Sequence, residues 1–198
     1  MPGRVVVALL TPVPWTPPGV PRAAWRAALA EDVVDLIAGL DQIEPAIAAT
    51  PADRPLVDAV VWPRMPRYEV PRATVGPVLA AAAADGYDIA AVIAADVPDL
   101  PGLLVGKLLR PLSTRTVAVA PNLGGPGLVG LASRLPAPDW LADVDLDTAS
   151  PVSVRAGSPR PSHVVTTPGW RRVRTPDDLS TLDPGLDGWA ATRAVLGG

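Results

Sequence analysis

The chain has 198 residues, no cysteine and a formal net charge of −3. Without cysteine, disulfide bonds and thiolate chemistry are excluded. The nearest thing to a basic patch is three arginines in one loop, Arg171, Arg172 and Arg174, which is too little for a nucleic-acid surface. No apolar stretch is long and unbroken enough to cross a bilayer as a helix. We therefore expect a soluble, cytoplasmic protein that binds neither nucleic acid nor membrane, with a single domain over residues 1–198.

Short aliphatic runs alternate along the chain with longer amphipathic segments, as in α/β proteins. We expect strands at residues 4–10, 43–49, 57–62, 89–95, 116–120 and 128–131. We expect helices at residues 23–40, 72–85, 100–112, 176–182 and 188–196. The run at 89–95 is apolar throughout, which is typical of a strand covered on both faces. The sequence therefore predicts a three-layer α/β/α fold with a mostly parallel central sheet, and it leaves most of residues 133–163 without assigned elements.

Two of the expected helices begin with a side chain that can cap them. Asp99 is expected to cap the helix at 100–112, because a proline follows it in the first turn. Thr175 is expected to cap the helix at 176–182, where a proline and two acids follow at the positive end of the helix dipole.

The loop after the strand at 89–95 is the first candidate site. Ligands of open α/β sheets bind beyond the carboxyl ends of the strands, and Asp96 lies at that point. A carboxylate there can hold Mg²⁺ or Mn²⁺ against nucleotide phosphates, because Mg²⁺ needs only one or two protein carboxylates. Alternatively, Asp96 only ends the strand by accepting backbone N–H groups from the turn. Its position alone leaves both roles open.

A glycine-rich turn at residues 121–127 is the second candidate. Gly124 and Gly125 would let the backbone approach a ligand closely, but glycines and prolines in succession are also typical of a plain tight turn, which we favour. The chain has no Walker or Rossmann glycine motif. His163 is the only histidine, and without cysteines or a Gly-x-Ser-x-Gly segment it predicts neither zinc chemistry nor a serine hydrolase.

The order of these features resembles a known family. A strand, DVPDL at 96–100, a helix, a strand, the Gly124-Gly125 pair and VRTPDDL at 173–179 follow one another as in a small bacterial branch of the GT-A nucleotide-diphospho-sugar transferase superfamily. This glycosyltransferase-like branch is related to 2-phospho-lactate guanylyltransferase of deazaflavin cofactor biosynthesis. The resemblance covers nearly the whole chain, and it implies a Rossmann-like sheet and a nucleotide or nucleotide-sugar as the partner.

The residues that hold metal and phosphate in that family are partly replaced. The opening loop keeps the family's Pro-Gly pair but lacks its lysine, so Arg22 remains to hold phosphate. Leu123 stands where the family has an acid before Gly-Gly. Arg174 stands where the family has the acid of its Val-Asp-Thr-Pro motif. The resemblance therefore implies Mg²⁺ or Mn²⁺ on Asp96 alone, and it assigns no catalytic residue. The nucleotide- or phosphate-binding residues that it implies are Arg22, Gly124, Gly125 and Arg174.

Two hypotheses about function follow. The first is a glycosyl or nucleotidyl transferase that uses Mg²⁺ or Mn²⁺ on Asp96. The second is a catalytically reduced relative that binds a nucleotide or serves as a protein-interaction scaffold, and a homo-oligomer or a protein partner stays open. The expected crevice contains Asp96, the glycine turn and Arg174, with Arg22 at its rim. Without a phosphate to hold, Arg174 is expected to pair with an acid such as Asp177 or Asp178.

Overall fold

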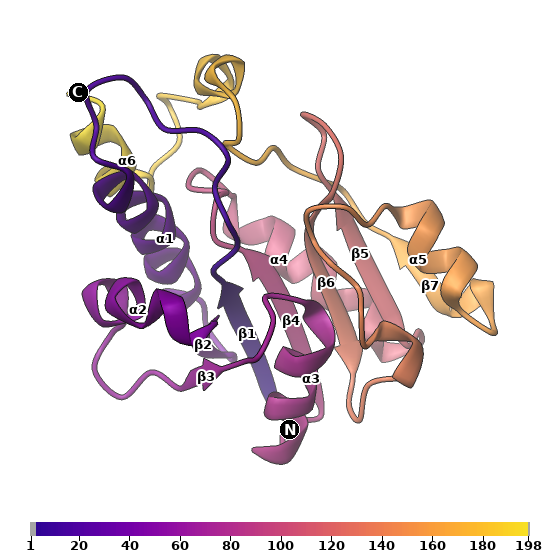
Figure 1. The fold of residues 1–198 in the computed structure, drawn as a ribbon. Coiled ribbons are helices and arrows are strands. Elements are labelled where there is room, and N and C mark those ends of the chain that lie inside the picture. Colours follow the sequence, from indigo (N-terminus) through magenta and orange to yellow (C-terminus); the bar gives the residue numbers. More distant parts are fainter. Residues whose placement is uncertain (1–2, 198) are drawn as a thin grey trace.

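The computed structural model describes residues 3–197, in which seven strands form one sheet with helices packed against it (Figure 1). The strands are β1 (Arg4–Leu9), β2 (Glu44–Ala49), β3 (Arg67–Glu69), β4 (Ile89–Ala94), β5 (Val117–Pro121), β6 (Leu128–Arg134) and β7 (Val164–Thr166). The α-helices are α1 (Arg22–Ala38), α2 (Arg54–Val60), α3 (Val75–Ala84), α4 (Gly102–Leu109), α5 (Pro151–Gly157) and α6 (Ala190–Val195). Short 3₁₀ helices are η1 (Pro51–Asp53), η2 (Arg110–Ser113), η3 (Asp139–Leu141), η4 (Pro161–His163) and η5 (Pro176–Thr181).

The sheet is mostly parallel, in the order β3-β2-β1-β4-β6-β5-β7. β1 pairs in parallel with β2 and β4, β2 with β3, and β5 with β7. Only β6 among these strands runs the other way, antiparallel to both β4 and β5. The carboxyl ends of the other strands therefore meet at one edge of the sheet, as the fold prediction requires.

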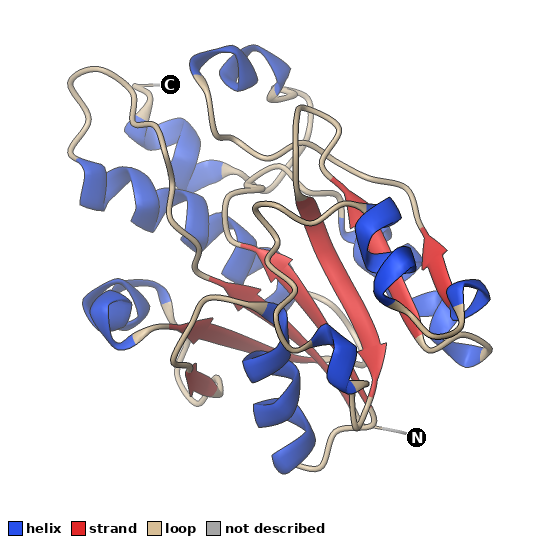
Figure 2. Ribbon diagram, turned by 45° about the vertical axis from the view of Figure 1, so that its right-hand side comes forward, coloured by secondary structure: helices blue, strands red, loops and turns tan. Residues whose placement is uncertain are grey.

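Helices cover both faces of the sheet, which confirms the predicted three layers (Figure 2). Val6 and Ala8 of β1 pack on the side of α1, α2 and α4, whereas Val5, Val7 and Leu9 pack on the side of α3, α5 and η3. This alternation is the two-residue period of a strand, and because both sides are covered the strand is apolar throughout. None of the helices in residues 3–197 is long and apolar enough to span a bilayer.

The strand predicted at residues 57–62 is wrong. The segment belongs largely to α2, which begins at Arg54 with a proline in its first turn. Val57 and Val60 are buried against the core, and a spacing of three residues places both on the inner side of a helix. The edge strand beside β2 is instead β3, three residues that the sequence did not single out.

Other elements begin or end elsewhere than predicted. The helix expected at 100–112 ends as α4 at Leu109 and continues as η2, because Pro111 has no N–H to donate to the helix. The helix expected at 72–85 begins only at Val75, since Thr74 is extended. The strand expected at 128–131 continues to Arg134 and pairs on both sides. Residues 133–163 contain α5, which a Ser150–Ser153 capping box starts.

Gly76 in α3 tests how tightly the helix layer is packed. A Cβ atom at this position would lie 2.4 Å from the backbone of Ala142, so Gly76→Ala should lower the free energy of unfolding by about 1–3 kcal/mol. The matched control is Gly106→Ala in α4, where a Cβ atom meets nothing within 4 Å. Because alanine favours a helix, this change should stabilise by about 0.4–1 kcal/mol. Urea unfolding measures both, and equal effects of the two changes would contradict the packing.

Candidate functional site

A pocket of about 410 Å³ opens at the edge of the sheet where β1 and β5 end. Pro14 and Trp15 follow β1, the turn with Gly124 and Gly125 follows β5, and Arg174 lies in the segment after β7; all line the pocket. Open α/β sheets bind their ligands in this place, and the volume lies in the range of small-molecule sites. The glycine turn and Arg174 therefore line one pocket, whereas Asp96, expected in the same crevice, and Arg22, expected at its rim, do not line it.

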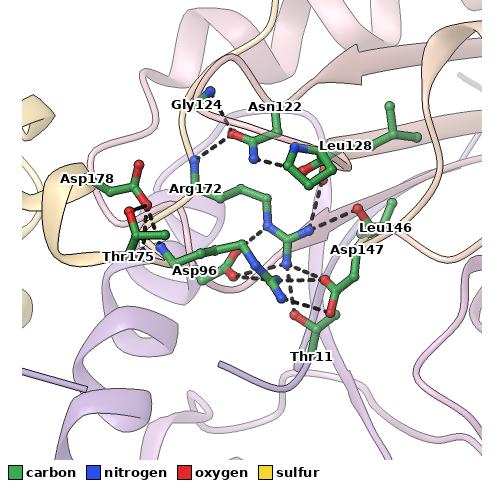
Figure 3. Close-up of polar contacts among 12 residues, drawn as sticks. Thr11, Asp96, Asn122, Gly124, Leu128, Leu146, Asp147, Arg172, Thr175 and Asp178 are labelled. Atoms are coloured by element: carbon green, nitrogen blue, oxygen red, sulfur yellow. Dashed lines mark hydrogen bonds and ion pairs between the residues drawn. The ribbon is translucent and has the colours of Figure 1, made fainter. Parts of the chain in front are cut away.

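Next to this pocket, Asp96 is enclosed in an ion pair with Arg172 (Figure 3). The side chain of Asp96 is 1% exposed and that of Arg172 is 0% exposed. Arg172 Nε donates to Asp96 Oδ1 at 2.6 Å, and Arg172 Nη2 donates to Asp96 Oδ2 at 2.9 Å. Two parallel bonds of this kind fit the planar guanidinium to the planar carboxylate.

The remaining donors of Arg172 also have partners. Nη1 donates to the backbone oxygens of Leu146 at 2.9 Å and Leu128 at 3.3 Å. Nη2 also donates to Thr11 Oγ1 at 3.0 Å and to Asp147 Oδ1 at 2.7 Å. Burial alone would lower the pKa of Arg172, but its two carboxylate partners outweigh burial and raise the pKa above its ordinary value. The side chain therefore stays charged.

Arg174 adds a second guanidinium to the same carboxylates. Its Nη1 lies 3.1 Å from Asp96 Oδ2 and 2.8 Å from Asp147 Oδ1, and its Nη2 lies 3.1 Å from Asp147 Oδ2. The side chains of Arg174 and Asp147 are 21% and 20% exposed, so this pair faces solvent. The expected pairing of the Arg174 side chain with Asp177 or Asp178 is wrong, because Asp178 accepts instead from the backbone N–H of Arg174 at 2.9 Å.

We call Arg172, Arg174, Asp96 and Asp147 the arginine–aspartate cluster. This cluster does not fit the divalent cation expected on Asp96. Mg²⁺ binds carboxylate oxygens at about 2.0–2.1 Å, but both oxygens of Asp96 already accept N–H groups from guanidinium groups. Within residues 3–197, no three side chains of His, Cys, Asp or Glu converge as metal ligands. The partners of Asp96 are therefore cationic side chains of the same chain.

The other predicted phosphate-binding residues lie in different surroundings. Gly124 and Gly125 line the pocket, and Asn122 Oδ1 accepts from the backbone N–H of Gly124 at 3.2 Å and from that of Arg172 at 3.1 Å. These bonds join the glycine turn to the cluster. Arg22 begins α1, donates to a backbone oxygen of the preceding loop at 2.5 Å and does not line the pocket described here. Phosphate binding by these residues stays a prediction.

Of the two predicted helix caps, one is confirmed and one is wrong. Thr175 forms a capping box with Asp178 at the start of η5, in which the backbone N–H of Thr175 donates to Asp178 Oδ2 at 2.8 Å. Asp99 does not cap α4, whose N-cap position is Pro101. Asp99 Oδ1 instead accepts from Trp170 Nε1 at 3.0 Å, since a partly buried indole N–H needs an acceptor.

Nothing in the sequence singles out Asp147, and Arg172 is only one of three arginines in a loop. Asp147 lies in a segment without assigned elements, where Asp145 Oδ1 accepts its backbone N–H at 2.8 Å. A local signal was present at Gly127, which has a φ of 96° and lies so close to Leu146 that a Cβ atom would come within 2.5 Å of its oxygen. Only glycine allows this approach, which brings Asp147 within hydrogen-bond distance of Arg172 and Arg174.

Comparisons with known proteins bear on the fold. No family model matches the sequence, and no sequence among the curated proteins matches it. A solved structure from Desulfovibrio desulfuricans G20, assigned as a nucleotide-diphospho-sugar transferase, has 20% identity and a TM-score of 0.70, covering 100% of this chain and 96% of that one. The chain has the nucleotide-diphospho-sugar transferase fold.

Two further structures share the nucleotide-diphospho-sugar transferase fold with this chain. 4-Diphosphocytidyl-2C-methyl-D-erythritol synthase from Anaerococcus prevotii has 9% identity and a TM-score of 0.62, covering 98% of this chain and 95% of its own. Glucosyl-3-phosphoglycerate synthase from Mycobacterium tuberculosis, solved with Mn²⁺, UDP and phosphoglyceric acid, has 15% identity and a TM-score of 0.61, covering 98% and 77%. At these identities the fold is shown, and the relation to 2-phospho-lactate guanylyltransferase stays a prediction.

The buried ion pair makes a quantitative prediction. Arg172→Met should lower the free energy of unfolding by about 3–5 kcal/mol, because it leaves the charge of Asp96 buried without its main partner. The double change Asp96→Asn/Arg172→Met should cost less than the two single changes added together, by about 0.5–3 kcal/mol. Urea unfolding of the four proteins measures this coupling.

The control for this cycle is Arg54→Met, which removes an exposed ion pair with Glu69. Such a pair contributes about 0–1 kcal/mol. Additive effects at Asp96 and Arg172 would contradict a coupled buried pair.

Asp99 makes a prediction about pH. Burial raises its pKa above the ordinary 3.8, and the hydrogen bond from Trp170 opposes this shift without cancelling it. The folded protein therefore holds the Asp99 proton more tightly than the unfolded chain, so the contribution of Asp99 to stability falls as pH rises through the raised pKa. Asp99→Asn keeps an acceptor for Trp170 without a charge. Its stability relative to wild type should increase between about pH 3 and about pH 7 in urea unfolding, and a constant or decreasing difference would contradict this assignment.

Proposed function

We propose that this protein is a nucleotide-dependent transferase, glycosyl or nucleotidyl, that binds a nucleotide or nucleotide-sugar in the pocket at the carboxyl edge of the sheet. The observation that carries the proposal is the guanidinium group of Arg174 in the wall of a pocket of about 410 Å³. The shared fold supports it, since the glucosyl-3-phosphoglycerate synthase of M. tuberculosis holds UDP in one of its solved structures.

Two kinds of side chain in this pocket suit the two ends of a nucleotide. Arg174 can form a charge-assisted hydrogen bond to a phosphate oxygen, which is stronger than a bond between neutral groups. Trp15 lines the same pocket, and its ring lies edge-on to that of the buried Trp25, with ring centres 6.0 Å apart. An aromatic ring fixed in this way offers a surface on which a base can stack. The proposal assigns no catalytic residue.

A second candidate function is favoured by the state of Asp96. This carboxylate is buried and bonded on both oxygens, so it is not free to act on a substrate. A catalytically reduced relative that binds a nucleotide, or that serves as a scaffold subunit in a homo-oligomer or with another protein, would keep the pocket without the chemistry. Residence in the cytoplasm stays a prediction under both candidates.

Calorimetry and a transfer assay together distinguish the two candidates. The purified protein is titrated with UDP, GDP, GTP and UDP-glucose, and transfer from UDP-glucose to water or to an added acceptor is followed in parallel. Binding with turnover supports the transferase, and binding without turnover supports the reduced relative. Failure of all four ligands to bind at millimolar concentration would contradict the nucleotide site and favour the scaffold.

Arg174→Met tests the residue on which the proposal rests. Loss of a charge-assisted bond to phosphate, worth about 1.5–3 kcal/mol, should weaken nucleotide binding by about tenfold or more in calorimetry. The matched control is Arg26→Met, because Arg26 is 19% exposed, pairs with Asp53 at 2.6 Å and does not line the pocket. The control should leave nucleotide affinity unchanged. Equal losses in both variants would show that lost stability, and not a lost contact, weakens binding.

A further inference from the structure

Three oxygen atoms from distant parts of the chain converge on one nitrogen atom of the arginine–aspartate cluster (Figure 3). Arg172 Nη2 lies 2.9 Å from Asp96 Oδ2, 2.7 Å from Asp147 Oδ1 and 3.0 Å from Thr11 Oγ1. Arg174 Nη1 approaches the same two carboxylates at 3.1 and 2.8 Å. Carboxylate and hydroxyl oxygens around one positive centre are the surroundings of a hard cation. Here a guanidinium nitrogen is that centre.

We propose that Arg172 and Arg174 take the place of a divalent cation, so that a nucleoside diphosphate binds to this site without Mg²⁺ or Mn²⁺. The statement about the cation stands on the cluster alone, whereas the statement about the nucleotide rests on the proposed function. Two guanidinium groups carry the same formal charge as one divalent cation. They balance the charges of Asp96 and Asp147, which would otherwise repel each other and any phosphate.

The guanidinium pair also excludes a cation. Arg172 is fully buried, and its Nε, Nη1 and Nη2 atoms all donate hydrogen bonds. The side chain cannot turn away without leaving Asp96 buried and short of a partner, which is strongly unfavourable. An entering metal ion would have to displace these bonds while next to two fixed positive charges. The site is therefore closed to metal as long as Arg172 is present.

Arg174 is the member of the cluster that faces the ligand. Its side chain is 21% exposed and lines the pocket, whereas Arg172 has no exposed surface. Within residues 3–197, the hydrogen bonds of the Arg174 guanidinium come from Nη1 and Nη2, which leaves its Nε–H without an acceptor. A diphosphate can therefore accept from Arg174 as it would coordinate a metal ion.

Arg172→Met tests whether Arg172 takes the place of a cation, because a metal ion should then stabilise the variant. The variant leaves Asp96 and Asp147 beside each other with only Arg174 between them. MnCl₂ should then raise its melting temperature in a concentration-dependent way, because a ligand that binds only the folded state stabilises it. Wild-type protein should show no such rise. Thermal unfolding by circular dichroism in MnCl₂, MgCl₂ or EDTA measures this, and refolding yield in MnCl₂ against EDTA replaces it if the variant is recovered unfolded.

Two further variants control for nonspecific effects of metal. Asp96→Asn/Arg172→Met lacks the buried carboxylate and should lose the response to MnCl₂. Arg172→Lys keeps a positive charge at the centre and, like wild type, should not respond. A wild-type protein that MnCl₂ stabilises would overturn the proposal. An Arg172→Met variant that MnCl₂ neither stabilises nor helps to refold, or a response that persists in the double variant, would also overturn it.

Calorimetry with UDP, GDP and GTP in EDTA and in MgCl₂ tests whether a nucleotide binds to this site without a metal ion. For any nucleotide that binds, the Kd should differ by less than about twofold between the two buffers. A Kd at least about tenfold lower in MgCl₂ would overturn metal-independent binding. If no nucleotide binds in either buffer, the proposed function and the statement about the diphosphate both fail. The response of Arg172→Met to MnCl₂ then still decides whether Arg172 replaces a cation.

Discussion

The buried ion pair between Arg172 and Asp96 holds the carboxyl edge of the sheet together. Taking two charges out of water is costly, and the cost is offset only where geometry is good and the remaining donors find partners. Arg172, which lies after β7, meets Asp96 after β4, Thr11 after β1 and the backbone oxygen of Leu146. Three segments that are distant in the sequence are thus fixed against one side chain. Pro14 and Trp15 follow Thr11, and Arg174 follows Arg172, so part of the pocket wall continues from segments that this pair holds in place.

The fold and the chemistry of the site depend on different residues. Aliphatic side chains on both faces of the strands build the sheet, and no member of the arginine–aspartate cluster lies in a strand. In the family that the sequence resembles, acids occupy the positions of Leu123 and Arg174. Both positions lie outside the strands, so the side chains there can differ without affecting the core of the sheet. Asp96 is neutralised by Arg172 and Arg174 of the same chain.

The sequence predicts those features of the structure that depend on residues close to one another in the chain. Continuous apolar runs predicted β1 and β4 because burial on both faces depends on the residues of the strand itself. The Thr175 cap was predictable for the same local reason. The strand expected at 57–62 failed because a short apolar run fits either period, and a proline in the first turn decided for a helix. Nothing local indicates which loop arginine turns inward, since Arg172 meets Asp96 across 76 positions of the chain.

The cluster has an inner and an outer half that differ in their freedom to exchange partners. Asp96 and Arg172 are sealed, whereas Asp147 and Arg174 are each about one fifth exposed. Asp147 reaches water and can be solvated if its bonds to Arg174 are exchanged, while Asp96 cannot, because a buried charge without a partner is strongly unfavourable. Under the proposed function, a phosphate that accepts from Arg174 Nε can also replace Asp147 on Nη1 and Nη2, and the inner pair stays unchanged. This exchange favours a ligand with more negative charge than one carboxylate, which a diphosphate has and a neutral sugar lacks.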